Sequence, residues 1–284
     1  MSLYTSILKQ VLVATDLSDQ ADHAVERALR LAAEHGAALD IVHVMEEGLP
    51  AAAEAEVRAA NENAIRAKLA ANPFTDKVTV TIDMVVGSAE TDIIERCVMT
   101  NANCIVLGLH DRLLPENRAI EGTLAETIIG HSQVPVLLVS EEPGGPYGSA
   151  VVGVDLSPLS HAAIQAAVLI APKAALHLVH AYEAETLSGQ ATARQALESL
   201  IAGEKQLLER AALKAGLPEI AVTAIAETGD PREVLKAQIA GRSADLLVLA
   251  THGRTGLSRT FAGSVATDLI NARLCDVLVI RPEQ

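Results

Sequence analysis

The sequence predicts an α/β protein of two tandem, doubly wound domains, each with a five-stranded parallel sheet flanked by helices. Three observations lead to this fold class. The 284 residues are enough for two domains that each bury a core. One pattern of apolar runs occurs in both halves of the chain. These runs are continuous and alternate with helical patterns, which is typical of a parallel sheet covered on both faces.

Each half opens with an apolar run that ends in an acidic turn: VLVATDLSDQADHA from Val11 and VVGVDLSPLSHAA from Val151. An alanine-rich segment with helical spacing follows each turn, so the first unit is a strand, a turn and a helix. A second apolar run then ends in a histidine both times, at His43 and at His180. Because the spacing between the two runs is nearly constant, the halves are predicted to be repeats.

The remaining elements also occur twice. Helices are expected over 51–71 and 189–215, strands in the runs that end at Gly87 and Gly229, and short helices in TDIIERCVM and REVLKAQIA. Fourth strands in CIVLGLHD and LLVLATHG, another helix, and closing strands in PVLLV and DVLVI complete each half. The intervening segment EEPGGPYG has the proline and glycine content of a linker, which predicts domains at 1–143 and 144–284.

Composition excludes several classes of function. A formal net charge of -14 disfavours nucleic acid as a partner, and two Phe, three Tyr and no Trp leave few platforms for stacked bases. No apolar run approaches the ~18 residues of a membrane span. The first residues lack the pattern of a secretion signal, so we expect a cytoplasmic protein without membrane contact. The three cysteines lack metal-ligand spacing and are expected to be core thiols.

A glycine-rich loop follows the fourth strand of the second half, in LATHGRTGLSRTFAGSVATDLI. Glycine allows a backbone to approach a phosphate closely, and this loop contains three: Gly253, Gly256 and Gly263. Arg254 and Arg259 add positive charge, and Ser264 can cap the next helix or donate its hydroxyl to a phosphate. In open α/β sheets, ligands bind beyond the carboxyl ends of the strands. The loop is therefore predicted to hold an anion.

The spacing A-x2-G-x9-G-S, from Ala250 to Ser264, resembles the G-x2-G-x9-G-[ST] loop of ATP-binding universal stress proteins. The acidic turn, the histidine that ends the second strand, the T-H-G sequence and the strand order also resemble that family across both halves. The resemblance implies ATP, with Mg2+, as the cofactor. It implies a binding site for this adenine nucleotide formed by Val154, Asp155, His180, Ala181, Ala250, His252, Gly253, Arg254, Gly263, Ser264 and Val265.

The first half departs from this motif. Gly108 occupies the first position, but Asp111 replaces the second glycine, and ten residues rather than nine precede Gly122 and Thr123. The loop from 108 to 123 carries a net charge of -1, whereas the loop from 250 to 264 carries +2. We therefore expect the first half to bind a triphosphate weakly or not at all.

Other polar residues have structural interpretations. Asp16 is expected to cap a helix, and Asp155 to combine a cap with ligand binding. His43 and His180 are expected to be packed, hydrogen-bonded side chains, since no ligand partner stands at metal spacing. We predict no metal site made of protein side chains and no nucleophilic triad, and we interpret His252 as a residue that shapes the loop.

The sequence thus predicts a nucleotide-responsive factor in stress resistance or regulation. No G-x4-G-K-[ST] loop or evident general base is present, so at most slow ATP hydrolysis is expected. Family dimers resemble two such domains joined through their last strands, which predicts either a homodimer or a pseudo-dimer within one chain. Two alternatives remain: an enzyme of the adenine-nucleotide α-hydrolase-like group, and a nucleotide-free scaffold that acts by dimerisation.

Overall fold

The computed structural model describes residues 8–109, 123–182, 187–251 and 264–281. In the first half the elements are β1 (Gln10–Ala14), α1 (Asp19–His35), β2 (Ala38–Met45), α2 (Ala51–Ala71), β3 (Val80–Val86), α3 (Ala89–Thr100), β4 (Cys104–Gly108), α4 (Leu124–His131) and β5 (Val136–Val139). In the second they are β6 (Ser149–Gly153), α5 (Pro158–Ile170), β7 (Ala175–Tyr182), α6 (Leu187–Gly203), α7 (Lys205–Ala215), β8 (Val222–Thr228), α8 (Pro231–Gly241), β9 (Leu246–Ala250), α9 (Ser264–Ala272) and β10 (Asp276–Ile280).

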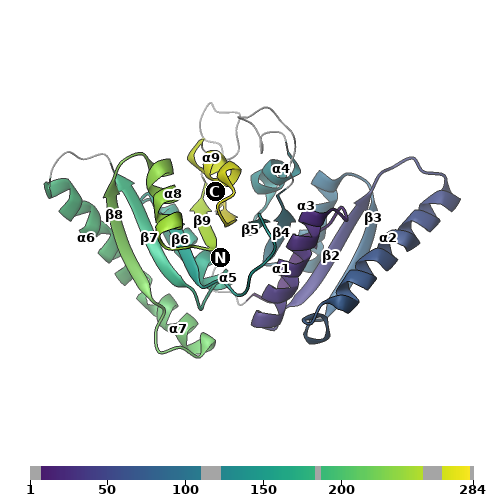
Figure 1. Ribbon diagram of the computed structural model, residues 1–284, viewed down its shortest axis with the longest axis horizontal. Coiled ribbons are helices and arrows are strands. Elements are labelled where there is room, and N and C mark those ends of the chain that lie inside the picture. The colour runs from purple at the N-terminus through teal and green to yellow at the C-terminus, as the bar shows by residue number, and fades with distance from the viewer. Residues whose placement is uncertain (1–7, 110–122, 183–186, 252–263, 282–284) are drawn as a thin grey trace.

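These strands form one sheet in the order β3-β2-β1-β4-β5-β10-β9-β6-β7-β8 (Figure 1). Within each half, neighbouring strands run parallel, as the continuous apolar runs predict. The two halves meet through β5 and β10, which pair antiparallel with Leu137 opposite Leu278. The prediction of two doubly wound repeats is confirmed, and the last strands join within one chain as a pseudo-dimer.

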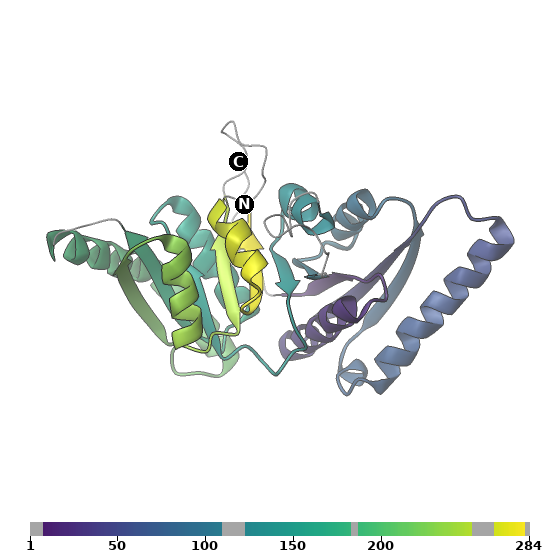
Figure 2. The same cartoon turned by 45° about the horizontal axis from the view of Figure 1, so that its top comes forward.

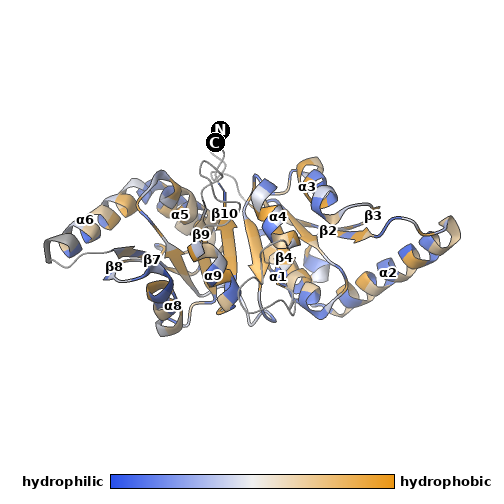
Figure 3. Cartoon of the chain, turned by 90° about the horizontal axis from the view of Figure 1, so that it is seen from above, coloured by the Kyte–Doolittle hydropathy of each residue, from blue (hydrophilic) through white to orange (hydrophobic). Residues whose placement is uncertain are grey.

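Apolar cores lie on both faces of the sheet because side chains alternate along each strand. Val11 and Val13 of β1 pack into the core under α1, α2, α5, α6 and α7, whereas Leu12 packs into the core under α3, α4, α8 and α9. Each core extends across both halves. Viewed from above, the strands in the middle are hydrophobic and the helices around them are mixed (Figure 3).

The outermost strands of the sheet are β3 and β8. The long helix α2 lies beside β3 at one end of the molecule and α6 lies beside β8 at the other (Figure 2). An edge strand presents unpaired backbone groups that can join another chain. The helices at both ends are placed to limit such pairing.

The prediction of one continuous helix over 189–215 is wrong, because α6 ends at Gly203 and α7 begins at Lys205. Between them, the carboxylate of Glu204 turns inward and is only 8% exposed. His161 Nδ1 donates a hydrogen bond to it over 2.8 Å, and Gln165 Nε2 donates another over 3.3 Å. Glycine is a poor helix former, so the break falls beside it while the buried carboxylate fixes the new direction.

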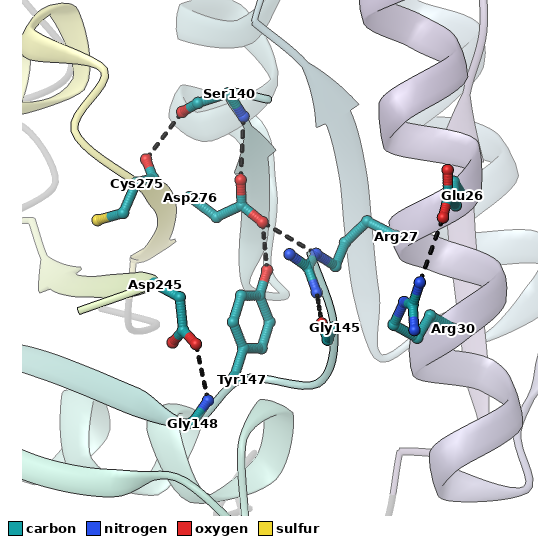
Figure 4. A network of polar contacts seen from close by, with 10 residues as sticks. All are labelled: Glu26, Arg27, Arg30, Ser140, Gly145, Tyr147, Gly148, Asp245, Cys275 and Asp276. Carbon is teal, nitrogen blue, oxygen red and sulfur yellow. Dashed lines mark hydrogen bonds and ion pairs between the residues drawn. The ribbon is translucent and has the colours of Figure 1, made fainter. Parts of the chain in front are cut away.

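A buried polar network joins the halves (Figure 4). Arg27 of α1 donates from Nε to Asp276 Oδ2 over 3.0 Å and from Nη1 to the carbonyl of Gly145 over 2.7 Å. The hydroxyl of Tyr147 donates to the same Asp276 oxygen over 2.6 Å, and Ser140 N donates to Oδ1 over 3.0 Å. The guanidinium also lies 4.2 Å from the centre of the Tyr147 ring. The segment with linker composition is therefore packed against both halves.

Burial raises the pKa of Asp276, because the loss of hydration outweighs the opposing charge of Arg27 and the hydrogen bonds that the carboxylate accepts. Burial also raises the pKa of Tyr147 well above its usual range. The phenol therefore keeps its proton and donates a hydrogen bond to the carboxylate. A charge pair taken out of water requires such complete hydrogen bonding to be tolerated.

A second contact across the halves predicts a pH dependence of stability. His35, at the end of α1, donates from Nε2 to the carbonyl of Ile170 at the end of α5 over 3.2 Å. Burial, with smaller effects from Lys214 and Lys173, lowers the pKa of His35. As pH falls below about 6.5, the unfolded chain therefore binds the proton before the folded chain does, and stability is lost.

Replacement of His35 with glutamine, which can still donate to Ile170, is expected to reduce this loss. The measurement is the free energy of unfolding in urea at pH 7.5 and at pH 5.0 for both proteins. The parent should lose more stability than His35→Gln between the two values. An equal loss would show that His35 does not contribute to the pH dependence.

Candidate nucleotide-binding site

The acidic turn after β6 is held by its own side chains. Asp155 Oδ1 accepts a hydrogen bond from Ser157 N over 2.9 Å and one from Ser160 Oγ over 3.1 Å. Leu156 between them has a φ of 62°, a left-handed conformation that is unusual for leucine. Ser157 caps α5 by accepting from Leu159 N. The turn thus fixes the Asp155 carboxylate at the carboxyl edge of the sheet.

The first half contains the same turn. In both halves, the prediction that the aspartate caps the helix is wrong. Asp16 Oδ1 accepts from Ser18 N over 3.0 Å, and Leu17 has a φ of 68°. The side chain that caps α1 is that of Ser18, which accepts from Ala21 N. Asp16 and Asp155 are therefore turn residues, and the serines two positions later are the helix caps. The side chain of each aspartate accepts a hydrogen bond from the backbone N–H two residues later, which forms a turn before the helix. The cap position of the helix is then left to the serine.

The histidines predicted to end the second strand of each half lie two residues before the ends of β2 and β7 and are hydrogen-bonded to the neighbouring strand ends. His180 Nδ1 donates to the carbonyl of Val154 over 2.9 Å, and its ring stacks on Tyr182. His43 Nδ1 donates to the carbonyl of Thr15 over 2.7 Å, so its Nε2 accepts from Asn61 Nδ2 over 2.9 Å. The prediction of packed histidines is confirmed. In the second half this contact sets Val154 beside His180 and Ala181.

The end of β9 presents a buried hydroxyl. Ala250 is the last residue of the strand, and Thr251 continues the ladder by donating its N–H to the carbonyl of Ile280 over 2.8 Å. Thr251 is 3% exposed, and its Oγ1 has no hydrogen-bond partner in the part of the chain that the structure describes. A buried hydroxyl without a partner is costly, which indicates a group that a ligand can satisfy. Sequence reasoning did not select Thr251.

A cationic side chain of α8 lies beside Ser264, at the start of α9. Arg232 of α8 donates from Nη2 to Ser264 Oγ over 3.0 Å, and its Nε lies 2.5 Å from the carboxylate of Asp268. Asp230, the cap of α8, also lies within ion-pair distance of this guanidinium. Sequence reasoning missed Arg232. The available signal was the D-P-R sequence one residue after β8, which places an arginine in the first turn of a helix at the carboxyl edge.

These features meet because of the strand order. β9, β6 and β7 are neighbours in the sheet, and the chain leaves β6 and β9 toward helices on opposite faces. Ligands of doubly wound sheets bind at such a switch point. The edge contains the predicted residues Val154, Asp155, His180, Ala181, Ala250, Ser264 and Val265. The other predicted site residues, His252, Gly253, Arg254 and Gly263, lie outside the described residues.

Within the described ranges, no group of three or more His, Cys, Asp and Glu side chains is arranged to hold a metal ion. The three cysteines form no disulfide, and burial raises the pKa of Cys97 to about 11 and that of Cys275 to about 12. Thiols with such pKa values are poor nucleophiles at neutral pH. Across the part of the chain that is described, no helix has the length and apolar character needed to cross a membrane.

The corresponding edge of the first half differs in chemistry. Leu109 follows Gly108 where Thr251 follows Ala250, and Val44 stands where the second half has Ala181. Gly108 itself is closely packed, since a Cβ at this position would lie 2.5 Å from the carbonyl oxygen of Gln20 in α1. The buried hydroxyl of the second half thus has an apolar counterpart in the first.

Comparison with known proteins identifies the family. The model of the universal stress protein family matches residues 8–140 and, a second time, residues 146–281. The chain belongs to the universal stress protein family. Both halves are universal stress protein repeats, and the resemblance seen in the sequence is confirmed.

Individual universal stress proteins resemble the chain at low identity. Universal stress protein E of Salmonella typhi is 29% identical over 164 residues, and the match covers 53% of this chain. The chain spans about half the length of that curated relative, since the match covers 52% of it. The match to universal stress protein E of Escherichia coli covers 18% of that protein. A universal stress protein of Mycobacterium tuberculosis is 26% identical over 238 residues, with 80% of this chain and 78% of that protein covered.

Solved structures confirm the architecture. The crystal structure of a universal stress protein from Archaeoglobus fulgidus superposes with a TM-score of 0.74 at 17% identity. The alignment covers 100% of this chain and 99% of that chain. At this identity the likeness shows the fold of the tandem repeat.

Proposed function

We propose that this universal stress protein binds one adenine nucleotide, ATP, at the carboxyl edge of its second half and acts as a nucleotide-responsive factor in stress resistance or regulation. The observation that carries the proposal is the buried hydroxyl of Thr251, which has no partner among the described residues at the switch point of the sheet. A bound nucleotide would supply that partner.

The surrounding groups fit a nucleotide. The base and ribose are proposed to contact Asp155 and the ends of β6 and β7, where the turn holds polar side chains that can hydrogen-bond neutral groups. Ser264 and the N-terminus of α9 are placed for phosphates, since backbone N–H groups and the helix dipole favour an anion there. The guanidinium of Arg232 beside Ser264 offers further N–H donors, with its charge balanced by Asp230 and Asp268.

Phosphates would recruit Mg2+ largely without protein ligands, as this ion keeps several waters and binds through phosphate oxygens. We propose that the chain binds ATP rather than turning it over rapidly. We also propose that the division at 1–143 and 144–284 separates a first domain with a degenerate loop from the domain that binds ATP.

Nucleotide extraction tests the proposal directly. The purified full-length protein is denatured with acid, and the released nucleotides are separated and quantified by chromatography. We expect adenine nucleotide at a ratio that does not exceed one per chain. If no nucleotide is released, and added ATP with Mg2+ does not bind, the nucleotide-free scaffold replaces this proposal.

Replacement of Thr251 with valine is expected to act differently on stability and on binding. Without nucleotide, the free energy of unfolding should stay the same or rise by about 1 kcal/mol, because an unsatisfied buried hydroxyl is removed. Affinity for ATP should fall about five- to tenfold, as expected for the loss of one hydrogen bond of about 1 kcal/mol. Urea unfolding and calorimetric titration measure the two effects.

Thr15→Val provides the matched control in the first half. The hydroxyl of Thr15 already accepts a hydrogen bond from Leu17 N over 3.1 Å, so this substitution should lower stability and leave ATP binding unchanged. Parent-like affinity of Thr251→Val would remove Thr251 from the site.

A further inference from the structure

The first half contains a cavity of about 420 Å³ at the carboxyl ends of β1 and β4, on the side of the sheet covered by α3 and α4. Its walls are mainly apolar, with contributions from Val42, Val44, Ile93, Leu107, Leu109 and Leu124. Sites for small molecules have this size and this predominance of apolar side chains. The cavity is separate from the edge of the second half discussed above.

Part of the wall comes from the second half of the chain. Ile270 and Asn271, in the last turn of α9, line the cavity together with Arg273. They reach it because β5 and β10 pair antiparallel, which brings the end of α9 to the carboxyl edge of the first half. The cavity is complete only in the tandem arrangement.

Most polar groups of the wall are used within the protein. The hydroxyl of Thr15 accepts from Leu17 N, and the hydroxyl of Thr123 caps α4 by accepting from Glu126 N. The carboxamides of Gln20 and Asn271 make no hydrogen bond within the described part of the chain and line the cavity. A carboxamide offers a donor and an acceptor without charge, which suits one neutral polar edge of a ligand.

Charge makes the start of α4 unfavourable for a phosphate group, while Arg273 adds a cation to the cavity wall. Glu126 stands in the first turn of α4. In the second half, α9 has no acidic residue in its first turn. Acidic groups at a helix start repel an anion where the helix dipole would otherwise attract it. The starts of α4 and α9 therefore differ in charge.

We propose that this cavity binds an uncharged, mainly apolar ring compound with one hydrogen-bonding edge. The apolar walls cover the faces of the ring, and the carboxamides of Gln20 and Asn271 hydrogen-bond its polar edge. Binding requires both halves, because α9 supplies Ile270 and Asn271. The site is independent of the nucleotide proposed for the second half.

The test is a fluorescence titration of the full-length protein with 2-naphthol, an uncharged two-ring probe with one hydroxyl. We expect saturable binding of one probe per chain that is not displaced when ATP and Mg2+ are added. Linear, non-saturating uptake would overturn the proposal, as would displacement of the probe by ATP.

Two variants locate the probe. Ala125→Phe, on a partly exposed position of α4 in the cavity wall, should fill the cavity and weaken binding at least tenfold. Met99→Phe adds the same ring on the exposed face of α3 and should bind like the parent. Parent-like binding by Ala125→Phe would overturn the proposal.

Asn271→Ala gives a second measurement that does not depend on filling the cavity. It should weaken 2-naphthol binding about fivefold by removing one hydrogen bond, with the folded state checked by thermal unfolding. Unchanged affinity in this variant would show that α9 does not contact the ligand and would contradict the requirement for both halves.

Discussion

Replacement of Asp276 with alanine is expected to destabilise the protein by about 3–5 kcal/mol, the cost of breaking a buried ion pair from one side. The side chains of Arg27 and Asp276 are 6% and 5% exposed, so the guanidinium cannot recover its hydration when the carboxylate is removed. The hydroxyl of Tyr147 and the N–H of Ser140 lose their acceptor as well. Urea unfolding of the parent and of Asp276→Ala measures the difference.

The double variant Arg27→Met with Asp276→Leu separates the loss of a partner from the loss of the pair. Apolar residues of similar size leave no unpaired buried charge, so this variant should recover a large part of the stability lost by Asp276→Ala. A loss below about 1 kcal/mol in the single variant would show that the network does not hold the halves together.

Replacement of Ser264 with aspartate is expected to lower ATP affinity about a hundredfold. The new carboxylate would lie at the start of α9, where the phosphates are proposed to bind. Two unit charges about 5 Å apart interact by roughly 3 kcal/mol at an effective dielectric near 20, which corresponds to about two powers of ten in affinity. It would also pair with Arg232, which now donates to Ser264, and so withdraw a cation from the ligand.

Adenosine distinguishes charge repulsion from damage to the fold. It has no phosphate, so Ser264→Asp should bind it within about twofold of the parent, and aspartate is itself favourable at a helix start. Thr123→Asp, at the matching start of α4, should leave ATP binding unchanged. Calorimetric titrations at one salt concentration make the comparison valid, because screening alters the charge term. Equal losses for ATP and adenosine would place the phosphates elsewhere.

The repeat could be predicted from the sequence because it depends on local patterns, and the strand order was implied by the resemblance to universal stress proteins. Continuous apolar runs beside helical spacing predict parallel strands, whereas the pairing of β5 with β10 was implied by the resemblance to dimers of the family. The histidines near the ends of β2 and β7 were also predicted as packed side chains, since nothing nearby suggested metal ligands.

What the sequence did not predict depends on contacts between distant segments. The partnerless state of Thr251 Oγ1 can be recognised only when its neighbours in space are known. Arg232 reaches Ser264 across 32 positions of the chain, and the break at Glu204 depends on His161, 43 positions away. The cavity of the first half escaped prediction because Asn271 reaches it only through the pairing of the last strands.

The stoichiometry of ATP binding tests the central claim most directly. After removal of any bound nucleotide, the full-length protein is titrated with ATP and Mg2+ in a calorimeter. We predict one site per chain, because the second half offers Thr251, Ser264 and Arg232 whereas the first offers an apolar edge with Glu126 at the start of α4. Two sites of similar affinity, or no binding, would contradict the account.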